Sequence, residues 1–229
     1  MRDARRLWRW IGGSLLAGLV LSAGMVTALR WLPLPSSSVM IQRILVGKPV
    51  HYRWVPLSDV APVMALAVVA SEDQKFPVHR GFDFEAIRGA VDEGAEGRRL
   101  RGASTLSQQV AKNLFLWEGR SWVRKGLEAW LTALLELLWP KGRILEVYLN
   151  VAEMGDGVFG VGEASRRHFG RDPGSLSTEQ AALLAATLPN PRRYSASAPS
   201  PYVRERQRWV LRQMDQLGGR SYLKGILPP

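Results

Sequence analysis

Cysteine is absent from this sequence of 229 residues. Its absence excludes disulfide scaffolds, iron–sulfur clusters, zinc sites built on cysteine and thiol nucleophiles, and it leaves the redox compartment undecided. The sequence has only three histidines, at positions 51, 79 and 168, and their spacing is not that of metal ligands. Segments that alternate between polar and apolar residues are also scarce. The sequence therefore predicts a mainly α-helical protein.

Acidic residues are in deficit, with 20 Asp and Glu against 31 Lys and Arg, which gives a formal net charge of +11. Such an excess predicts an anionic partner, which can be nucleic acid, a phospholipid surface or a phosphorylated substrate. The length is that of one globular domain with a small appendage. The hydrophobic content of 46% is enough for a packed core and excludes wholesale disorder.

No charged residue occurs between Ile11 and Leu29. As a helix this run is about 28 Å long, close to the thickness of the hydrocarbon core of a bilayer. Arginines precede the run and tryptophans flank it, which is typical of a membrane-spanning segment whose N-terminus is cytoplasmic. We therefore expect a cytoplasmic tail over residues 1–10, a transmembrane anchor over 11–30 and the rest of the chain outside the cytoplasm, where nucleic acid is not a partner. A cleaved signal peptide, with small residues such as Ala23 at its cleavage site, is the alternative.

Glycine and proline divide the remainder of the chain into helices. Residues 31–49 are rich in Pro and Ser and predict a linker, and residues 50–229 form the expected globular domain. Residues 93–103 are charged and rich in glycine, which predicts a loop. Ser58 or Asp59 is the expected N-cap of the first helix of the domain. Helices are expected over residues 60–73, 105–114, 122–139, 141–151, 177–188 and 200–218, two of them opened by capping boxes.

Glu72 is the first candidate for chemistry. It follows Met64 and Val68 at spacings of four residues, so it extends the apolar face of the helix expected over 60–73. A carboxylate in that place is partly desolvated, and burial raises the pKa of a carboxyl group toward that of a useful general base. The same spacing also fits a glutamate at a helix end that points into water. The pattern leaves both interpretations open.

A second set of candidates lies on the helix expected over 105–114. Four polar residues fall on one of its faces: Thr105, Gln108, Gln109 and Lys112. Hydroxyl, amide and ammonium groups on one face could bind sugar hydroxyls and phosphate oxygens. An ordinary capped amphipathic helix with a solvated face is the alternative.

The helix expected over 122–139 carries a third set. Arg124 and Glu128 border its apolar stripe, whereas Glu136 lies opposite the stripe and should be solvated. Arg124 and Glu128 could belong to a site or form a surface ion pair, and the pattern does not decide between them. Glu146, on the next helix, could likewise bind a base or a substrate group, or be an ordinary surface residue.

Three other patterns carry no function in this interpretation. The segment from Gly155 to Gly160 has the GxGxxG form, but no strand is expected before it and no βαβ unit surrounds it, so a dinucleotide site is not expected. Ser221 and Lys224 have the SxxK spacing without the partner motifs of penicillin-binding enzymes. The arginines of the last helix, at positions 204, 206, 208 and 212, predict a solvated face that could contact anionic lipid.

Five segments with polar and charged residues occur in order along the chain: Glu72–Asp83, Gly102–Asn113, Arg124–Glu128, Arg143–Asn150 and Leu176–Leu184. Together they resemble the five motifs of the peptidoglycan glycosyltransferases, glycosyltransferase family 51. The resemblance spans about residues 50 to 218, and it matches the monofunctional, membrane-anchored form without a transpeptidase domain. It implies a mainly α, lysozyme-like fold. It also implies an enzyme of the bacterial inner membrane that polymerises lipid II on the periplasmic side.

The resemblance implies roles for single residues as well. Glu72 matches the catalytic base of the family, and Glu128 matches its second active-site carboxylate. The residues that match its substrate-binding cleft are Asp73, Phe76, His79, Thr105, Gln109, Lys112, Asn113, Arg124, Lys125 and Glu146, and Gln108 joins them as part of the same helix face. The implied partners are lipid II, the growing glycan strand and the phospholipid membrane, with other cell-wall synthesis proteins left open.

The expected reaction is inverting β-1,4 glycosyl transfer with release of polyprenyl diphosphate. A sugar that leaves as a lipid diphosphate needs no protonated acid, because cations such as Lys112, Arg124 and Lys125 can neutralise the charge of the leaving group. We expect Glu72 to deprotonate the 4-hydroxyl of the incoming disaccharide and Glu128 to orient the cations, with a divalent ion (Mg or Mn) left open as a cofactor. The alternatives are a lysozyme-like enzyme that cleaves glycan and a basic, membrane-tethered scaffold protein.

Overall fold

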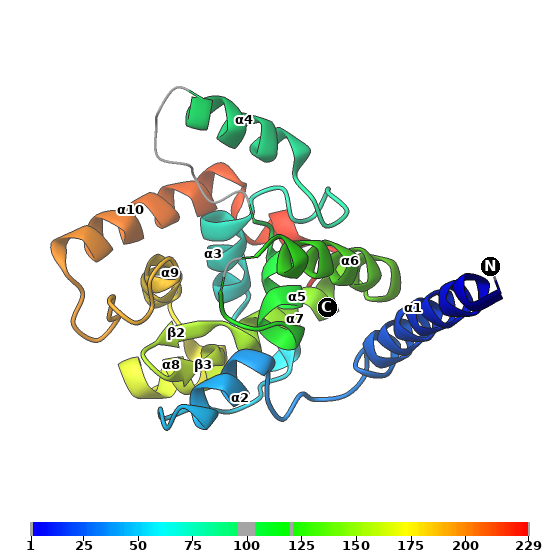
Figure 1. Ribbon diagram of the computed structural model, residues 1–229. Coiled ribbons are helices and arrows are strands. Elements are labelled where there is room, and N and C mark those ends of the chain that lie inside the picture. Colours follow the sequence, from blue (N-terminus) through cyan, green and yellow to red (C-terminus); the bar gives the residue numbers. More distant parts are fainter. Residues whose placement is uncertain (1, 96–103, 120, 229) are drawn as a thin grey trace.

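The computed structural model describes residues 2–95, 104–119 and 121–228, which form a mainly helical protein with a small sheet (Figure 1). The helices are α1 (Arg2–Ala28), α2 (Ser38–Leu45), α3 (Pro62–Glu72), α4 (Phe84–Ala95), α5 (Leu106–Phe115), α6 (Trp122–Leu138), α7 (Lys141–Val151), α8 (Gly160–Phe169), α9 (Thr178–Thr187) and α10 (Pro201–Gln216). The strands are β1 (His51–Tyr52), β2 (Glu153–Gly155) and β3 (Val158–Phe159). Short 3-10 turns occur at Leu57–Asp59, Pro173–Ser175 and Gly219–Leu223. The expected mainly α class is confirmed.

Helix α3 lies in the interior of the domain. Every residue from Val63 to Ala70 is buried, so the helix is apolar on all sides, as expected for a core helix. Helices α9 and α10 pack against α3, and α5 packs against α6 and α7 (Figure 1). The first residue of α3, Pro62, is exposed, and at the other end Ser71 and Glu72 reach the edge of this packed interior.

The three strands form one sheet in the order β1–β3–β2. Strand β1 pairs with β3 in parallel, and β2 pairs with β3 in antiparallel. Because β2 ends at Gly155 and β3 lies just before Gly160, the expectation that no strand precedes the glycine-rich segment was wrong. The strands are too short to show alternation, which is why the pattern missed them. A hairpin is nevertheless not the βαβ unit of a dinucleotide site.

Two expected capping boxes are confirmed at the starts of α5 and α9. At α5, the Thr105 hydroxyl accepts the backbone N–H of Gln108, and the Gln108 side chain accepts the backbone N–H of Thr105. Ser177 and Gln180 make the same pair of bonds at α9. The helices expected over residues 122–139, 141–151 and 200–218 are confirmed as α6, α7 and α10, whereas α4 and α8 were not expected.

Three local features differ from the expectations. Helix α3 begins at Pro62 with Ala61 as its N-cap, because Ser58 and Asp59 belong to a 3-10 turn instead. Helix α2 lies inside the expected linker, and it is too short for periodicity to reveal it. Helix α4 continues to Ala95, so it covers the first residues of the predicted loop, and the rest of that loop lies outside the described residues.

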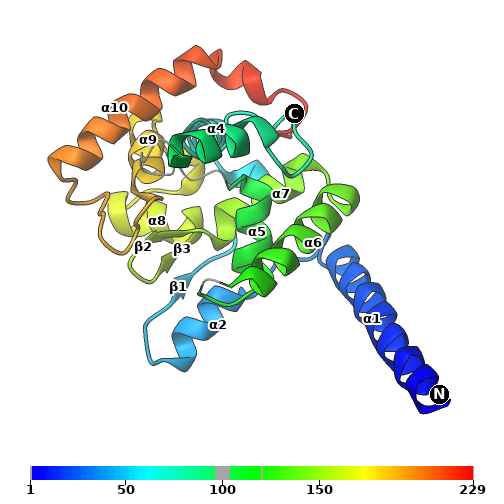
Figure 2. The ribbon, with the colours of Figure 1, turned by 45° about the horizontal axis from the view of Figure 1, so that its top comes forward.

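Helix α1 projects from the domain (blue in Figures 1 and 2). Near its C-terminal end the indole N–H of Trp130 donates to the hydroxyl of Ser22 (3.2 Å), and that of Trp139 donates to the carbonyl of Val26 (2.7 Å). In the part of the chain that the structure describes, we find no helix that combines the length and the apolarity needed to cross a bilayer. The transmembrane anchor expected over residues 11–30 is therefore not confirmed.

Candidate active site

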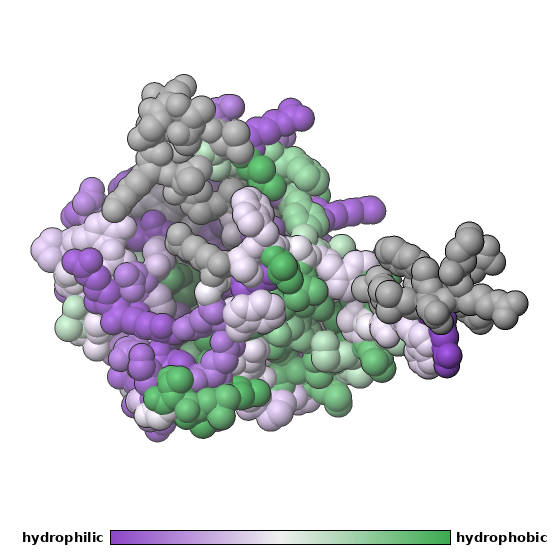
Figure 3. All heavy atoms as spheres, viewed as in Figure 1, coloured by the Kyte–Doolittle hydropathy of each residue, from purple (hydrophilic) through white to green (hydrophobic). Residues whose placement is uncertain are grey.

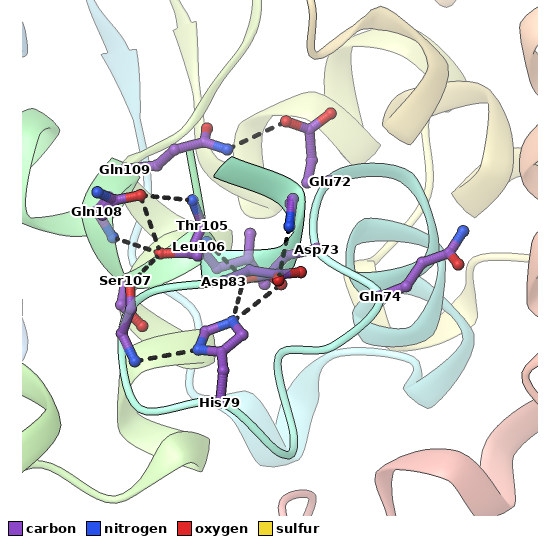
Figure 4. A network of polar contacts seen from close by, with 12 residues as sticks. Glu72, Asp73, Gln74, His79, Asp83, Thr105, Leu106, Ser107, Gln108 and Gln109 are labelled. Atoms are coloured by element: carbon purple, nitrogen blue, oxygen red, sulfur yellow. Dashed lines mark hydrogen bonds and ion pairs between the residues drawn. The ribbon is translucent and has the colours of Figure 1, made fainter. Parts of the chain in front are cut away.

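The carboxylate of Glu72 lies at the C-terminal end of α3 and is 15% exposed. One of its oxygens accepts the side-chain amide of Gln109 (3.1 Å; Figure 4). The other accepts the hydroxyl of Ser71 (3.3 Å). Burial raises the pKa of the Glu72 carboxyl group, and the nearby charge of Asp73 adds to the rise, although Gln109 and Arg206 act in the opposite direction. The expected desolvation of Glu72 is confirmed, and the alternative of a fully solvated side chain is not.

Asp73 joins the end of α3 to the start of α5. Its carboxylate accepts the backbone N–H of Leu106 (2.9 Å) and contacts Nε2 of His79 at 2.9 and 3.0 Å. Because Nδ1 of His79 accepts the backbone N–H of Gly81 (3.0 Å), the ring proton is assigned to Nε2, which donates to Asp73. The Thr105 hydroxyl donates to the carbonyl of Gly81 (2.7 Å), so the loop that follows α3 is held at both ends (Figure 4).

The amide of Gln109 is oriented from behind by Tyr148 of α7. The Tyr148 hydroxyl donates to Oε1 of Gln109 (3.4 Å), which leaves the amide nitrogen to face Glu72. Tyr148 is almost completely buried, and burial raises the pKa of its hydroxyl well above the ordinary value. A neutral tyrosine is thus the donor that sets the orientation of Gln109. No sequence pattern indicated a role for Tyr148 in the site.

A second buried carboxylate, Glu128 of α6, is surrounded by cations. Arg124 donates to one of its oxygens (2.8 Å) and Lys125 to the other, while the Glu128 side chain is only 4% exposed. Lys112 of α5 lies close enough for the charge of Glu128 to act on it, although burial is the larger effect and lowers the pKa of Lys112. The Arg124–Glu128 pair is therefore part of a partly buried cluster and not a solvated surface pair.

Two cavities flank α5. The larger, with a volume of about 540 Å³, is lined by polar residues that include Gln109, Lys112, Asn113 and Arg124. The smaller, about 390 Å³, is lined by Glu72 and several other polar residues: Asp73, Gln74, Lys75, Asp83, Glu85, Ser104 and Thr105. The hydrogen bond between Glu72 and Gln109 links the two sets of lining residues. Glu128 lines neither cavity itself but holds Arg124, which lines the larger one.

Five of the predicted binding residues line neither cavity: Phe76, His79, Gln108, Lys125 and Glu146. His79 and Lys125 are bonded to the carboxylates of Asp73 and Glu128, as described above. Gln108 is buried and its side chain turns back to close the capping box with Thr105, as glutamine does at this helix position. Phe76 is fully buried and lies under the ammonium group of Lys141. Glu146 accepts the backbone N–H of Leu57 and the guanidinium of Arg143 and thus holds α7 to a neighbouring turn. The structure therefore places these five side chains in supporting positions.

Two charged residues lie in environments that differ from the expectations. Arg206 was expected on a solvated face of the last helix, but it is 23% exposed, lies 3.8 Å from Glu72 and donates to Ser71 (3.3 Å). It shares a helix face with the buried Val203 and Val210, and this spacing was the signal that could have revealed it. Glu136 was expected to be solvated, but Ser107 and Lys141 both donate to its carboxylate.

The chain thus has a mainly helical fold, a desolvated carboxylate at Glu72 and a partly buried cluster of cations around Glu128. These features agree with the glycosyltransferase class that the five motifs indicated. A family model described as "Transglycosylase" matches residues 38–215. The biosynthetic peptidoglycan transglycosylase of Xanthomonas campestris pv. campestris is 52% identical, over 97% of this chain and 94% of the relative. Those of Cronobacter sakazakii and Yersinia pseudotuberculosis are 55% and 53% identical, over 93% and 97% of this chain and 87% and 96% of the relatives. The chain belongs to the transglycosylase family, and the resemblance given by its five motifs is confirmed.

Proposed function

We propose that this chain is a peptidoglycan glycosyltransferase that polymerises lipid II into glycan strands. Family membership and the names of its relatives support the activity. The single observation that carries the mechanism is the pair of unlike carboxylates. Glu72 has a raised pKa and neutral hydrogen-bond donors, whereas Glu128 is held between two cations.

Glu72 is the proposed general base. It takes the proton of the 4-hydroxyl of the incoming disaccharide as that oxygen attacks C1 of the growing strand and inverts the anomeric centre. The raised pKa brings the proton affinity of Glu72 closer to that required for this transfer. Gln109 keeps the carboxylate in place, and Tyr148 keeps Gln109 in place, so the basic oxygen is oriented before substrate binds.

The cations on the other side of α5 are the proposed binding site for the departing diphosphate. As the bond from C1 to the diphosphate oxygen breaks, the electron pair leaves with polyprenyl diphosphate, and Lys112 and Arg124 can stabilise the charge from the wall of the larger cavity. Glu128 accepts hydrogen bonds from two cations and orients them, which suits a positioning role and not that of a proton donor.

A divalent ion is not needed in this proposal. Within residues 2–95, 104–119 and 121–228, no group of three or more His, Asp or Glu side chains could hold a metal ion. Both oxygens of Glu128 are also bonded to cationic side chains. We derive no step through a divalent ion, and Mg or Mn stays a prediction.

Membrane attachment is the second part of the proposal. Residues 1–10 are proposed as a cytoplasmic tail, 11–30 as an anchor and 31–49 as a linker, with the domain of residues 50–229 on the outer side of the bacterial inner membrane. The supporting observations are the uncharged run and the exposed apolar side chains of α1, α2 and α6: Leu16, Val20, Leu21, Ile41, Ile44, Leu45, Val46, Trp122, Val123 and Leu137. Figure 3 shows hydrophobic residues gathered over α2. Such a surface is suited to contact with lipid. Binding to other cell-wall synthesis proteins stays a prediction.

The test is polymerisation of purified lipid II by the full chain in detergent or vesicles. Glu72→Gln keeps the size and hydrogen-bonding capacity of the side chain but removes the base, so the rate should fall by about two orders of magnitude or more. Glu205→Gln, which changes an exposed glutamate of α10, is the matched control and should keep the wild-type rate. Circular dichroism and thermal melting check that both variants fold.

Two results would contradict this proposal. Near-normal polymerisation by a folded Glu72→Gln variant would remove Glu72 from the role of base. Cleavage of finished cell-wall glycan by the wild-type chain, without polymerisation of lipid II, would support the lysozyme-like alternative. Absence of both activities would favour the scaffold alternative.

A further inference from the structure

A network of ion pairs joins two segments that line the larger cavity. Glu118, between α5 and α6, and Arg192, after α9, form an ion pair although they are 74 positions apart in sequence. Arg192 also donates to Glu153 (3.0 Å), and Glu153 accepts from Arg43 of α2 (2.7 Å). Glu118, Glu153 and Arg192 all line the cavity, so the network runs along its border.

The outer ion pair lies on the open side of the cavity. The side chains of Glu118 and Arg192 are 51% and 40% exposed. Tyr148 and Phe159, which line the same cavity, are buried. The cavity therefore has a buried floor and an exposed ion pair at its mouth.

The two halves of the network differ in rigidity. Arg43 and Glu153 are 4% and 11% exposed, and Glu153 also accepts the backbone N–H of Gly157 (3.0 Å). The contact between Glu118 and Arg192 is exposed, and exposed ion pairs contribute only about 0–1 kcal/mol. Arg192 uses Nε for Glu153 and Nη2 for Glu118, so the bond to Glu153 does not depend on the contact with Glu118. The network therefore has a buried half and an exposed half that can open separately.

An enzyme that polymerises glycan makes a product longer than this cavity, so the product must leave through the open side. We propose that the Glu118–Arg192 ion pair closes over the growing strand, retains it between successive additions and thereby sets the length of the product. The inference rests on the proposed function, which places the diphosphate end of the growing strand at this cavity. A strand between the closed pair and the buried floor cannot leave sideways, and opening of the pair is the step that releases it.

Product length separates retention from chemistry. The number of additions per encounter is the rate of addition divided by the rate of release, so a weaker ion pair shortens the product even where the rate of bond formation is kept. Glu118→Gln and Arg192→Gln each remove one charge of the pair while keeping a polar side chain. Loss of up to about 1 kcal/mol corresponds to products about two- to fivefold shorter on gel analysis of polymerised lipid II, with a smaller change in the initial rate. Both changes break the contact between Glu118 and Arg192, and Arg192→Gln also removes the charge that pairs with Glu153, so it should be the more affected variant. The double variant should therefore make products no shorter than those of Arg192→Gln alone.

Matched controls and contrary outcomes make the test decisive. Glu205→Gln and Arg208→Gln remove exposed charges of α10 outside the network and should leave product length unchanged. Wild-type product length in both single variants would overturn the inference, and so would additive shortening in the double variant. An equal fall in rate and in length would assign the two residues to substrate binding and would also overturn it. Failure of the wild-type chain to polymerise lipid II would instead reject the proposed function itself.

Discussion

Two glutamates of this site have opposite chemical character because their hydrogen-bond donors differ. Glu72 accepts from a neutral amide and a hydroxyl, and burial raises the pKa of its carboxyl group. Glu128 accepts from a guanidinium and an ammonium group. Glu72 has neutral donors and can receive a proton, whereas both oxygens of Glu128 are occupied by cationic donors that it holds in place. The division of roles therefore follows from the neighbouring residues and not from the residue type.

The charge of Asp73 is predicted to tune this base. Asp73 raises the pKa of Glu72, so Asp73→Asn should lower it. A general base works when it is deprotonated, so activity is lost as the pH falls through its pKa. In the Asp73→Asn variant this loss should occur at lower pH than in the wild type. The measurement is the pH profile of kcat/KM for polymerisation of lipid II.

Asp83→Asn is the matched control for this prediction. Asp83 lines the same cavity as Glu72, but its charge is not among the causes that act on the pKa of Glu72. The acidic limb of the pH profile of the Asp83→Asn variant should match that of the wild type. An Asp73→Asn profile that is unchanged, or displaced to higher pH, would contradict the tuning, provided that thermal melting shows a folded variant.

At the scale of secondary-structure elements, the turn from β3 into α8 depends on a glycine. Gly160 has φ +74°, and a Cβ there would lie 2.4 Å from the carbonyl oxygen of Asn150 at the end of α7. The Asn150 side chain in turn bonds both the N–H and the carbonyl of Val55 (2.8 Å each). Close approach of three backbone segments is thus possible only without a side chain at position 160.

We predict that Gly160→Ala destabilises the protein more than Gly170→Ala. Both glycines have positive φ, which costs a non-glycine residue about 1–2 kcal/mol, but an added Cβ at Gly170 meets no atom within 4 Å. The clash with Asn150 should add about 2 kcal/mol or more to the cost at Gly160. Urea unfolding of the two variants measures the difference. Equal losses of stability would show that the backbone conformation alone, and not the close approach, requires glycine.

At the scale of the whole molecule, the direction of α1 is set by contacts with the domain. The carbonyl of Val26 accepts from Trp139, and that of Leu29 accepts from Arg143 (2.8 Å). The guanidinium of Arg143 also lies over the ring of Trp139 (5.5 Å), so the two donors support one another. The exit of α1 is therefore fixed to α6 and α7, and α1 is not a freely jointed tether (Figure 2).

Trp139→Phe should loosen this junction while keeping the apolar ring. Loss of one buried hydrogen bond of about 1–1.5 kcal/mol predicts trypsin cleavage after Arg30 that is about five- to tenfold faster. Trp122→Phe, at a side chain that is 92% exposed, is the control and should not change the cleavage rate. Equal cleavage rates for wild type and Trp139→Phe would show that the indole bond does not hold α1.

Local features of the site could be predicted because they depend on neighbours in sequence. Spacing of four residues placed Glu72 beside the apolar side chains of α3, and a capping box marked the start of α5 at Thr105. The order of the five motifs identified the family. Short elements could not be predicted, since β1–β3 and α2 contain too few residues for a period to appear.

Partners from distant elements could not be predicted in the same way. Arg206 lies beside Glu72 because α10 packs on α3, and Glu136 is paired because Ser107 and Lys141 approach it from two other segments. Glu146 accepts a hydrogen bond from Leu57 and does not line a cavity, again because segments that are distant in sequence meet in the fold. Each outcome depends on which helix faces meet.

The sequence by itself determined most of the longer helices, the candidate base and the family, because helix caps and apolar periodicity act over a few residues and the motifs keep their order along the chain. Only the tertiary structure decided which charges are buried and paired. The environment of Glu72 includes Gln109 from α5 and Arg206 from α10, and the pKa of a carboxyl group depends on such neighbours in space. The same holds for the ion pair of Glu118 and Arg192, whose partners meet only once the chain has folded.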